Sequence, residues 1–450
     1  MHIYRDIYKH IPIFGSLMPG IIGFYPFGEG RENWNACRFL YYGLNALQHR
    51  GQESTGLSSL GKDRLLSTIN DDVMVEDFFK EKAGSLKEGH IAIGQTSPIK
   101  GDGVIYVKEP VELVCVGDGK PDLHPDKVTA FKIFSEKLSQ MIYKCGDTLE
   151  ATKSIIREVH GGYSFIVLTK NEEMICGRDI HGVKPLEIGA IGFDIGIVAS
   201  ETAALDVMGA EHTGSVNPGE VVIFDPLSIR RERCGEPNRK YCSFEYIYLA
   251  RLDSYLNGIS VSKVRENIGR ALARERPIQA NVVIGIPETA LAFAMAYSEE
   301  ARIPTRIGFV RTGRYTRSAI RPTQLERLTG VQLKLNPVRY SVDNKDVILI
   351  DDSVVRGNTL KSTVLDLKRK GAKRVHVKIG SPALVAPCPY GTEVPPRDEL
   401  IGGNLSEEEI SYVIGADSFS FLPISKLVEC IGLKESELCM KCFGVDWEVK

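Results

Sequence analysis

Two adjacent carboxylates, Asp351 and Asp352, stand between an apolar run and a loop of small residues. The run DVILI predicts a buried strand, the segment from Ser353 to Thr359 predicts a loop, and TLKSTVLDLKRKG predicts a helix. Backbone N–H groups at a helix start lack intrahelical partners and carry the positive end of the helix dipole, so they bind phosphate groups. The carboxylates suit the cis hydroxyls of a ribose, or the waters around a Mg²⁺ ion. The pattern therefore indicates a site for a phosphorylated sugar.

A simpler interpretation exists for the Asp-Asp-Ser triplet alone, namely a polar loop that caps a helix. The hydroxyls of Ser353 and Thr359 add hydrogen-bond donors for a phosphate, and Gly357 lets the backbone approach a ligand closely. Strand, loop and helix together favour phosphate binding over simple capping.

The elements that must position this loop alternate between strand and helix along the C-terminal half. Helical and apolar strand patterns follow one another in SVSKVRENIGRALARER, NVVIGIP, ALAFAMAYSEEA, DVILID, TLKSTVLDLKRKG and RVHVKIGS. This alternation is typical of an α/β domain with a parallel sheet. From Gly20 to about Asp225, short β-type runs with few long helices predict an α+β domain, and the polar stretch from Pro226 to Tyr241 predicts the border between the two.

Length and charge exclude several classes of protein. A chain of 450 residues predicts two or three domains. The net charge of -2 comes from 56 basic and 58 acidic residues without a long basic run, so we expect no nucleic-acid or membrane partner. No apolar stretch approaches the roughly 20 residues that span a bilayer, and the first residues lack a secretory signal pattern. We therefore expect a soluble cytoplasmic protein.

The segment VILIDDSVVRGNTLKS resembles the phosphoribosyl pyrophosphate (PRPP) motif of type I phosphoribosyltransferases, and specifically that of glutamine amidophosphoribosyltransferases. YCSFEYIYLARLDS, VVIGIPETA, GFVRTGRYTRSAIRPTQ and KLNPVRY resemble the same family in order and spacing. The resemblance implies a PRPP site made of Glu288, Thr289, Asp351, Asp352, Ser353, Val354, Val355, Arg356, Gly357, Asn358 and Thr359.

Further roles follow from the same resemblance. It implies that Thr289, Asp351 and Asp352 hold Mg²⁺, and that Asp351 and Asp352 act in catalysis together with Arg311 and Arg317. The two arginines belong to residues 311–321, which resemble a flexible loop that closes over PRPP. This loop departs from its relatives, because Thr312 and Gly313 stand where Asn and Arg are usual.

Ten cysteines in an intracellular protein of this size are expected to be thiols or metal ligands rather than disulfides. Cys439 and Cys442 form a C-x-x-C pair, which alone suits zinc binding, redox chemistry or neither. The resemblance implies a [4Fe-4S] cluster held by Cys242, Cys388, Cys439 and Cys442. Zinc in the same four thiolates is the rival interpretation.

The N-terminal half resembles the glutaminase domain of the same family through GIIGFY, NALQHRGQESTGL, RDIHGVKPLEIG, VASETAALD and NPGEVVIFD. The resemblance implies an αββα fold of the N-terminal nucleophile hydrolase type. We therefore expect an extension at residues 1–19, a class II glutamine amidotransferase-like domain at 20–232, and a phosphoribosyltransferase domain with C-terminal helices and the cysteine cluster at 233–450.

The glutaminase-like half lacks the residues that its relatives use on glutamine. Pro19 stands where they have a nucleophilic cysteine that becomes the N-terminal residue. Ser97 in GQTSP replaces the arginine of G-H-x-R-Y, and Val116 in CVGD replaces the asparagine of H-N-G-N, whereas Gly117 and Arg50 are kept. We predict that glutamine is not hydrolysed, and we interpret Cys37, in a helical pattern, as a packed thiol rather than a substitute nucleophile.

Two functions are compatible with this combination. The first is an enzyme of de novo purine biosynthesis that makes 5-phosphoribosylamine from PRPP and ammonia. The second is an inactive regulatory or scaffold paralogue that binds PRPP or purine nucleotides and joins a complete amidotransferase or a separate glutaminase. Phosphoribosyl transfer to another amine is a third hypothesis. The resemblance also implies a homo-oligomer.

Overall fold

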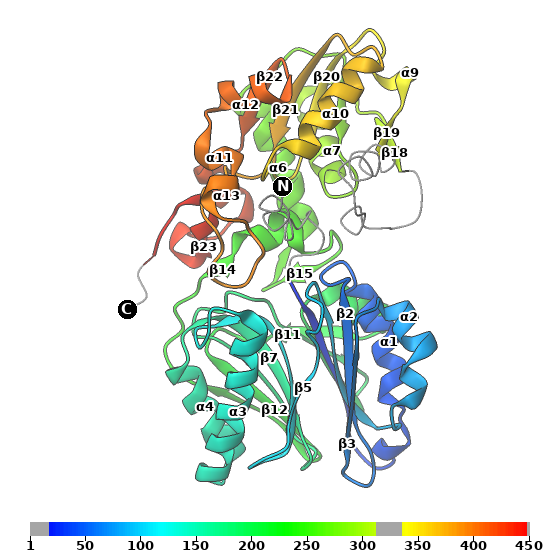
Figure 1. Cartoon of the computed structure of the whole chain (residues 1–450), viewed down its shortest axis with the longest axis vertical. Helices are drawn as coiled ribbons and strands as arrows, with labels where there is room; N and C mark the ends of the chain where they lie inside the picture. The colour runs from blue at the N-terminus through cyan, green and yellow to red at the C-terminus, as the bar shows by residue number, and fades with distance from the viewer. Residues whose placement is uncertain (1–17, 312–334, 448–450) are drawn as a thin grey trace, which may run out of the picture.

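Two antiparallel sheets stacked face to face form the lower half of the molecule in the computed structural model, which describes residues 18–311 and 335–447 (Figure 1). The seven-stranded sheet has the order β11 (Glu211–Ser215), β9 (Glu187–Ile191), β10 (Ile195–Ala199), β1 (Gly20–Pro26), β4 (Ile91–Ser97), β2 (Ser54–Leu60) and β3 (Leu66–Asp71). The six-stranded sheet has the order β13 (Ser228–Arg233), β12 (Glu220–Asp225), β8 (Met174–Arg178), β7 (Gly161–Thr169), β6 (Leu113–Pro121) and β5 (Ile105–Val107).

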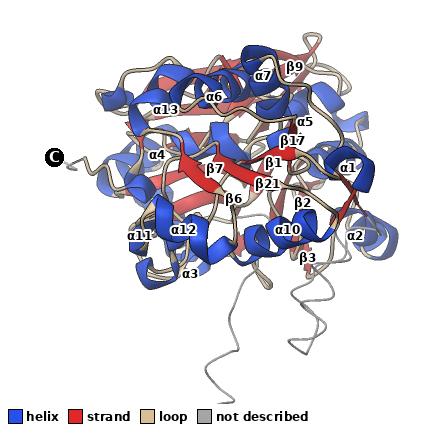
Figure 2. Cartoon of the chain, turned by 90° about the horizontal axis from the view of Figure 1, so that it is seen from above, coloured by secondary structure: helices blue, strands red, loops and turns tan. Residues whose placement is uncertain are grey.

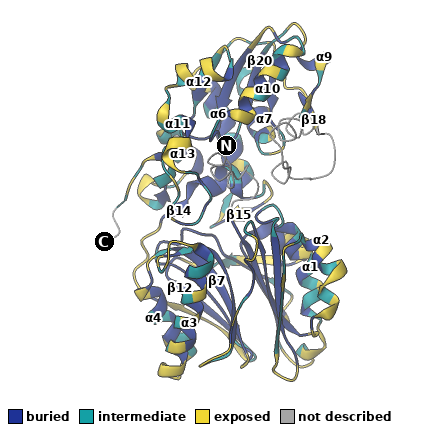
Figure 3. Ribbon diagram, in the orientation of Figure 1, coloured by how far each residue is buried: buried dark blue, intermediate teal, exposed yellow. Residues whose placement is uncertain are grey.

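Helices cover the outer face of each sheet. The seven-stranded sheet packs on α1 (Ala36–Ala46), α2 (Val75–Glu81) and α5 (Thr202–Val207), and the six-stranded sheet packs on α3 (Lys127–Cys145) and α4 (Thr148–Glu158). A third apolar core lies between the sheets, so the layers run αββα. This confirms the predicted fold class. Exposed residues lie on the outward sides of the helices, among them α1, α2, α3 and α4 (Figure 3).

A parallel four-stranded sheet organises the upper half. Its order is β17 (Val282–Gly285), β20 (Asp346–Asp351), β21 (Arg374–Ile379) and β22 (Ser418–Phe421). One face packs on α6 (Val261–Glu275), α7 (Ala290–Ala301) and α13 (Ile424–Ile431), and the other on α10 (Asn358–Arg369) and α12 (Glu407–Ile414) (Figure 2). Because both faces are covered, the strands are almost continuously apolar.

Short elements complete the upper half. Paired strands are β14 (Tyr241–Cys242) with β23 (Leu438–Cys439), β15 (Tyr255–Leu256) with β16 (Ile259–Ser260), and β18 (Phe309–Arg311) with β19 (Leu335–Pro337). Short helices are α9 (Arg339–Val342), α11 (Ile401–Asn404) and a π-helical turn at Glu245–Leu249. In residues 18–311 and 335–447 no helix is long and apolar enough to cross a membrane.

Local sequence explains where the main helices begin. Asp126, Asp147 and Ser260 each accept a hydrogen bond from a backbone N–H in the first turn of α3, α4 and α6. Ser406 and Glu409 form a capping box at the start of α12. The predicted helices of the C-terminal half are confirmed, whereas α3 and α4 are helices that the strand-rich pattern of the N-terminal half did not single out.

Candidate functional site

The carboxyl ends of β17 and β20 bring two predicted PRPP segments together. Gly285 lies opposite Ile350 in the parallel ladder, and the backbone N–H of Ile286 donates to the carbonyl of Ile350 at 2.9 Å. The loop that holds Glu288 and Thr289 therefore lies beside Asp351 and Asp352, and Thr289 is near enough to Asp352 to lower the pKa of that carboxyl. Ligands of open α/β sheets bind at this kind of edge.

The loop after β20 is fixed by packing and by its own polar groups. Val354 and Val355 are 5% and 6% exposed and pack into the cores on opposite sides of the sheet. The backbone N–H of Asp352 donates to the Asp351 carboxylate at 3.0 Å, and the Ser353 hydroxyl donates to Asp352 at 2.8 Å. The two valines thus contribute anchoring and backbone groups rather than accessible side chains.

Gly357 ends the loop and begins α10. Its φ of 76° lies in the left-handed region, and an added Cβ would lie 2.8 Å from the Ile401 side chain, so a side chain here would be strained and crowded. Asn358 and Thr359 form the first turn of α10, and Arg356 is held by Glu399 at 2.6 Å. The start of α10 therefore faces the same sheet edge as the two carboxylates.

Electrostatics at this edge oppose the charged forms of both acids. Burial, and then repulsion from Asp352, raises the pKa of Asp351 well above its usual range. Burial raises the pKa of Asp352 to about 6, although Ser353, Arg265 and Thr289 act in the opposite direction. A half-buried and a buried carboxylate with too little cationic compensation are a suitable place for a divalent cation or for sugar hydroxyl donors.

The predicted catalytic arginines lie at the border of what the structure describes. Arg311 is the last residue of β18, opposite Leu335 of β19. Arg317 lies outside the described residues, as do Thr312 and Gly313.

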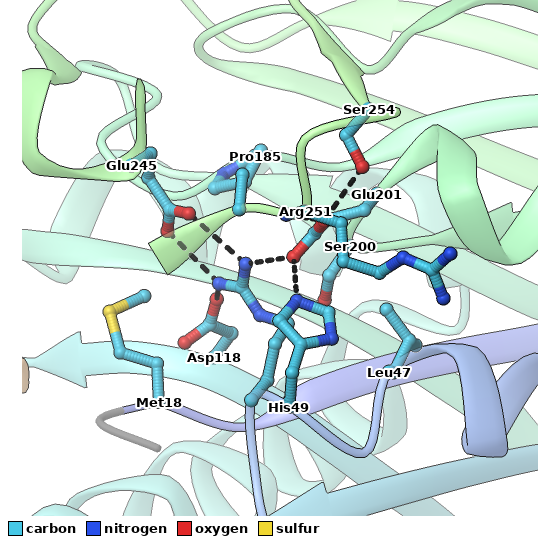
Figure 4. Close-up of polar contacts among 12 residues, drawn as sticks. Met18, Leu47, His49, Asp118, Pro185, Ser200, Glu201, Glu245, Arg251 and Ser254 are labelled. Carbon is cyan, nitrogen blue, oxygen red and sulfur yellow. Dashed lines mark hydrogen bonds and ion pairs between the residues drawn. The ribbon is translucent and has the colours of Figure 1, made fainter. Parts of the chain in front are cut away.

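Arg50 is buried beside Pro19, where relatives have the nucleophile, and its carboxylate partners Asp118, Glu201 and Glu245 are labelled in Figure 4. Its Nε donates to the Pro19 carbonyl at 3.1 Å, and its Nη atoms donate to Glu201 at 2.7 Å, to Asp118 at 3.0 Å and to Glu245 at 3.0 and 2.9 Å. A guanidinium has five N–H donors, and these five bonds use all of them. Arg50 therefore has no donor left for a substrate carboxylate.

The backbone N–H of Gly117, at the predicted oxyanion position, is also bonded within the protein. The backbone N–H of Gly117 donates to Gln95 at 3.2 Å, and Gln95 in turn donates to Asp102 at 3.1 Å. Ser97, at the position of the missing arginine, donates to the same carboxylate at 2.5 Å. Val116, at the position of the missing asparagine, is fully buried in the core between the sheets. The backbone N–H of Gly117 and the hydroxyl of Ser97 are thus both bonded within the protein.

Cys37 lies on α1 among the partly buried residues of the core beneath that helix. Burial raises the pKa of its thiol, with smaller opposing effects from Ser59 and the backbone of Gly89. A protonated packed thiol is a poor nucleophile, which agrees with its interpretation as a core residue.

The four predicted cluster ligands come from three separate segments and line one small cavity, together with Lys184 and Lys441. Cys242 and Cys439 are register partners in the β14–β23 ladder. Cys442 is joined to the segment before Cys388 by the bond from the Val385 N–H to the Cys442 carbonyl, at 2.9 Å. Burial raises the pKa of Cys439 to about 11, and raises the pKa of Cys242 and Cys442 further.

These cysteines are not gathered around a single point. In the described part of the chain, no three His, Cys, Asp or Glu side chains are grouped tightly enough to hold one metal ion. The four cysteines thus line one small cavity, and the described residues form no preformed site for a single metal ion.

Several functional contacts were not predicted from the sequence. They involve Gln95, Asp102, Asp118, Glu201, Glu245 and Arg265. Arg265 gave a usable signal, since it interrupts the apolar stripe of α6 formed by Val264, Ile268 and Leu272. Gln95 and Asp102 are close in the chain, whereas Asp118, Glu201 and Glu245 meet at Arg50 only through long-range folding.

Comparisons with known proteins agree with this geometry. Residues 253–383 match the model of the phosphoribosyl transferase domain family. The chain is 35% identical to the amidophosphoribosyltransferase of Methanothermobacter thermautotrophicus (95% of this chain, 94% of the relative) and 36% identical to that of Bacillus subtilis (91% and 90%). The solved glutamine PRPP amidotransferase of B. subtilis, complexed with ADP and GMP, superposes with a TM-score of 0.80 at 33% identity, over 94% of this chain and 96% of that one. This chain therefore belongs to the amidophosphoribosyltransferase family.

Proposed function

We propose that this chain forms 5-phosphoribosylamine from PRPP with ammonia, and not glutamine, as the nitrogen donor. One contrast supports the proposal most directly. The PRPP loop is kept in full, whereas Arg50 of the glutaminase-like half donates all five of its guanidinium N–H groups to partners within the protein. A transferase that has lost its glutamine site needs free ammonia, or ammonia from a separate glutaminase.

The proposed reaction is a displacement at the anomeric carbon of PRPP. The nitrogen lone pair of ammonia forms the new C–N bond, the C–O bond to pyrophosphate breaks, and the aminium group then loses a proton to water. The carbon gains oxocarbenium character in the transition state, so binding and charge stabilisation matter more than a general base.

Each part of the sheet edge has a role in this proposal. Backbone groups from Ser353 to Thr359 hold the 5-phosphate at the start of α10, and Asp351 and Asp352 accept bonds from the ribose hydroxyls. Thr289 and the two aspartates would hold Mg²⁺, which neutralises the pyrophosphate when bound. Arg311 and Arg317 are proposed to stabilise the leaving group.

The cysteine cavity supports a polynuclear cluster rather than zinc. A single zinc ion needs four sulfur atoms about 2.3 Å from one point, and the described cysteines are not gathered in that way. A [4Fe-4S] cluster holds its four thiolates farther apart, and the cavity is lined by Cys242, Cys388, Cys439 and Cys442. The cluster would join β14 and β23 to the segment at Cys388, with a structural or oxygen-sensing role.

A regulatory paralogue is the second candidate, and the altered glutaminase pocket favours it. In that role the chain would bind PRPP or purine nucleotides without turnover, within a homo-oligomer or beside a complete amidotransferase. The solved relative complexed with ADP and GMP supports a test with these nucleotides.

Pyrophosphate release by anaerobically purified protein separates the candidates. PRPP and Mg²⁺ are supplied with ammonium, with glutamine, or with neither. Release with ammonium alone is expected. Release with glutamine would contradict the account of Arg50 and Pro19, and binding of PRPP without any release would favour the paralogue.

A further inference from the structure

One segment, residues 245–255, is held by the glutaminase-like half although it leads into the transferase half (Figure 4). We call it the connecting segment. Glu245 at its start receives two hydrogen bonds from Arg50, at 3.0 and 2.9 Å. Near its end, the N–H of Arg251 and the hydroxyl of Ser254 both donate to Glu201, at 2.8 and 2.7 Å. Arg50 also binds Glu201 at 2.7 Å, so one buried ion cluster fixes both ends of the segment.

The transferase half holds the same segment from the opposite side. Arg265 of α6 donates through Nε to the Tyr246 carbonyl at 3.0 Å and through Nη2 to the Ala250 carbonyl at 2.6 Å. These carbonyls lie in and just after the π-helical turn at Glu245–Leu249. Arg265 is only 3% exposed, so its position depends on these bonds.

Packing also connects the segment to the PRPP edge. Ile247 and Leu249, in the turn that Arg265 holds, lie in one buried core with Ile350 and Val355, which flank Asp351 and Asp352. The sequence of contacts therefore runs from Arg50 to Glu245, to the turn that Arg265 holds, and through this core to the residues that flank Asp352.

Asp118 makes the cluster stronger than the family pattern requires. In the pattern H-N-G-N, Asp118 of CVGD stands at the position of the final asparagine. Here it is a fully buried carboxylate that accepts from Arg50 at 3.0 Å. Charge-assisted bonds of this kind are stronger than bonds to a neutral amide. The chain thus loses groups for glutamine and gains one that immobilises Arg50.

We propose that Arg50 is a positioning residue for the transferase site. Together with Glu245 and Arg265 it fixes the connecting segment, and the packing of this segment keeps Asp352 in position to bind PRPP. In this proposal the glutaminase-like half contributes to PRPP binding although it does not hydrolyse glutamine. This inference rests on the proposed PRPP site, but it does not require that the site turns over.

The test compares graded changes in the cluster with a remote control. R50M leaves three buried carboxylates without their cation, so it is accompanied by the milder E245Q and by D118N, which restores the amide of the family pattern. R230M removes an exposed arginine paired with Asp225 and serves as the control. The dissociation constant of PRPP with Mg²⁺ is measured by calorimetry on the full chain, and KM and kcat are measured with ammonium well below the unfolding temperature.

The proposal gives a specific kinetic signature. E245Q should weaken PRPP binding and raise its KM about three- to tenfold, D118N about two- to threefold, and kcat at saturating PRPP should change less than about twofold. R230M should match the wild type. The inference would be wrong if E245Q and D118N lowered the unfolding temperature but bound PRPP as the wild type does. The cluster would then have only a structural role. A wild-type chain that binds no PRPP would instead overturn the PRPP site on which the inference rests.

Discussion

Two regions differ in how far the protein neutralises its acidic side chains. One is the PRPP edge, the carboxyl ends of β17 and β20 with Asp351 and Asp352; the other is the Arg50 cluster of Arg50, Asp118, Glu201 and Glu245. At the edge, burial raises the pKa of Asp352 to about 6, and the pKa of Asp351 is also raised, because the protein supplies too little positive charge. In the cluster, His49 and Arg50 overcome the effect of burial and lower the pKa of Glu201 below its usual range. The two aspartates at the sheet edge thus lack sufficient cationic partners, whereas Glu201 in the cluster has cationic partners within the protein.

The largest expected effect breaks the PRPP edge. D351N together with D352N removes both acceptors for the ribose and the cation, so PRPP binding should weaken about 10²- to 10⁴-fold, since bonds to charged groups contribute roughly 1.5–3 kcal/mol each. Isothermal titration with PRPP and Mg²⁺ measures the loss. D366N, on the same side of the sheet in α10, should bind as the wild type does. Retained tight binding by the double variant would refute the site.

The next effect concerns the cysteine cavity. The pair C439S and C442S should abolish bound iron and lower the unfolding temperature by roughly 5–10 °C, because a metal site bound only in the folded state stabilises that state. Iron and sulfide analysis should give about four of each per wild-type chain. The exposed Cys145 provides the matched control C145S, which should keep both. One zinc per chain would contradict the cluster.

Acid should weaken the Arg50 cluster selectively. The folded-state pKa of Glu201 is lowered, so its contribution to stability is present above the unfolded value of about 4.3 and is lost as pH falls below it. E201Q should cost about 1–3 kcal/mol at pH 7 and should make unfolding less sensitive to pH between about 5 and 3. Thermal unfolding across this range, beside E211Q on the exposed strand β11, measures both. An equal pH slope in E201Q and the wild type would contradict the assignment.

The smallest effect has the opposite sign and sharpens the contrast. The folded-state pKa of Asp352 is raised, so the free energy of unfolding increases as pH falls through about 6. Above that pH the ionised carboxylate destabilises the folded state. D352N should therefore raise the stability of the ligand-free protein at pH 7 by about 1–2 kcal/mol while it weakens PRPP binding. Unfolding without Mg²⁺ or PRPP measures the gain. A large loss of stability would show that Asp352 is a structural residue.

Local patterns were enough to predict the elements that carry the PRPP loop. The apolar run before Asp351, the helix at α10 and the alternation around them are confirmed, because period and capping are properties of nearby residues. Helix α3 was not singled out although Ala130, Phe134, Leu138 and Ile142 carry its apolar face. The exchange of glutaminase groups at Pro19, Ser97 and Val116, and the loss of glutamine hydrolysis expected from it, were inferred from the family resemblance and stay predictions.

The Arg50 cluster could not be predicted because its members are far apart in the chain. Arg50 meets Asp118, Glu201 and Glu245 across 68, 151 and 195 residues. No local period specifies such a meeting, and a charged residue in a conserved-looking motif is equally compatible with a substrate contact. Only the packed structure shows that all its donors are used. The proposed domain border, the PRPP roles and the Mg²⁺ ligands stay predictions.

The most direct test of the account is a competition between nitrogen donors. Unlabelled ammonium and glutamine labelled with ¹⁵N at the amide are supplied together with PRPP and Mg²⁺. The amine product is trapped chemically, and its ¹⁵N content is measured by mass spectrometry. The account predicts unlabelled product only, with the glutamine recovered intact. Product that carries ¹⁵N would show that glutamine is still used and would contradict the central claim.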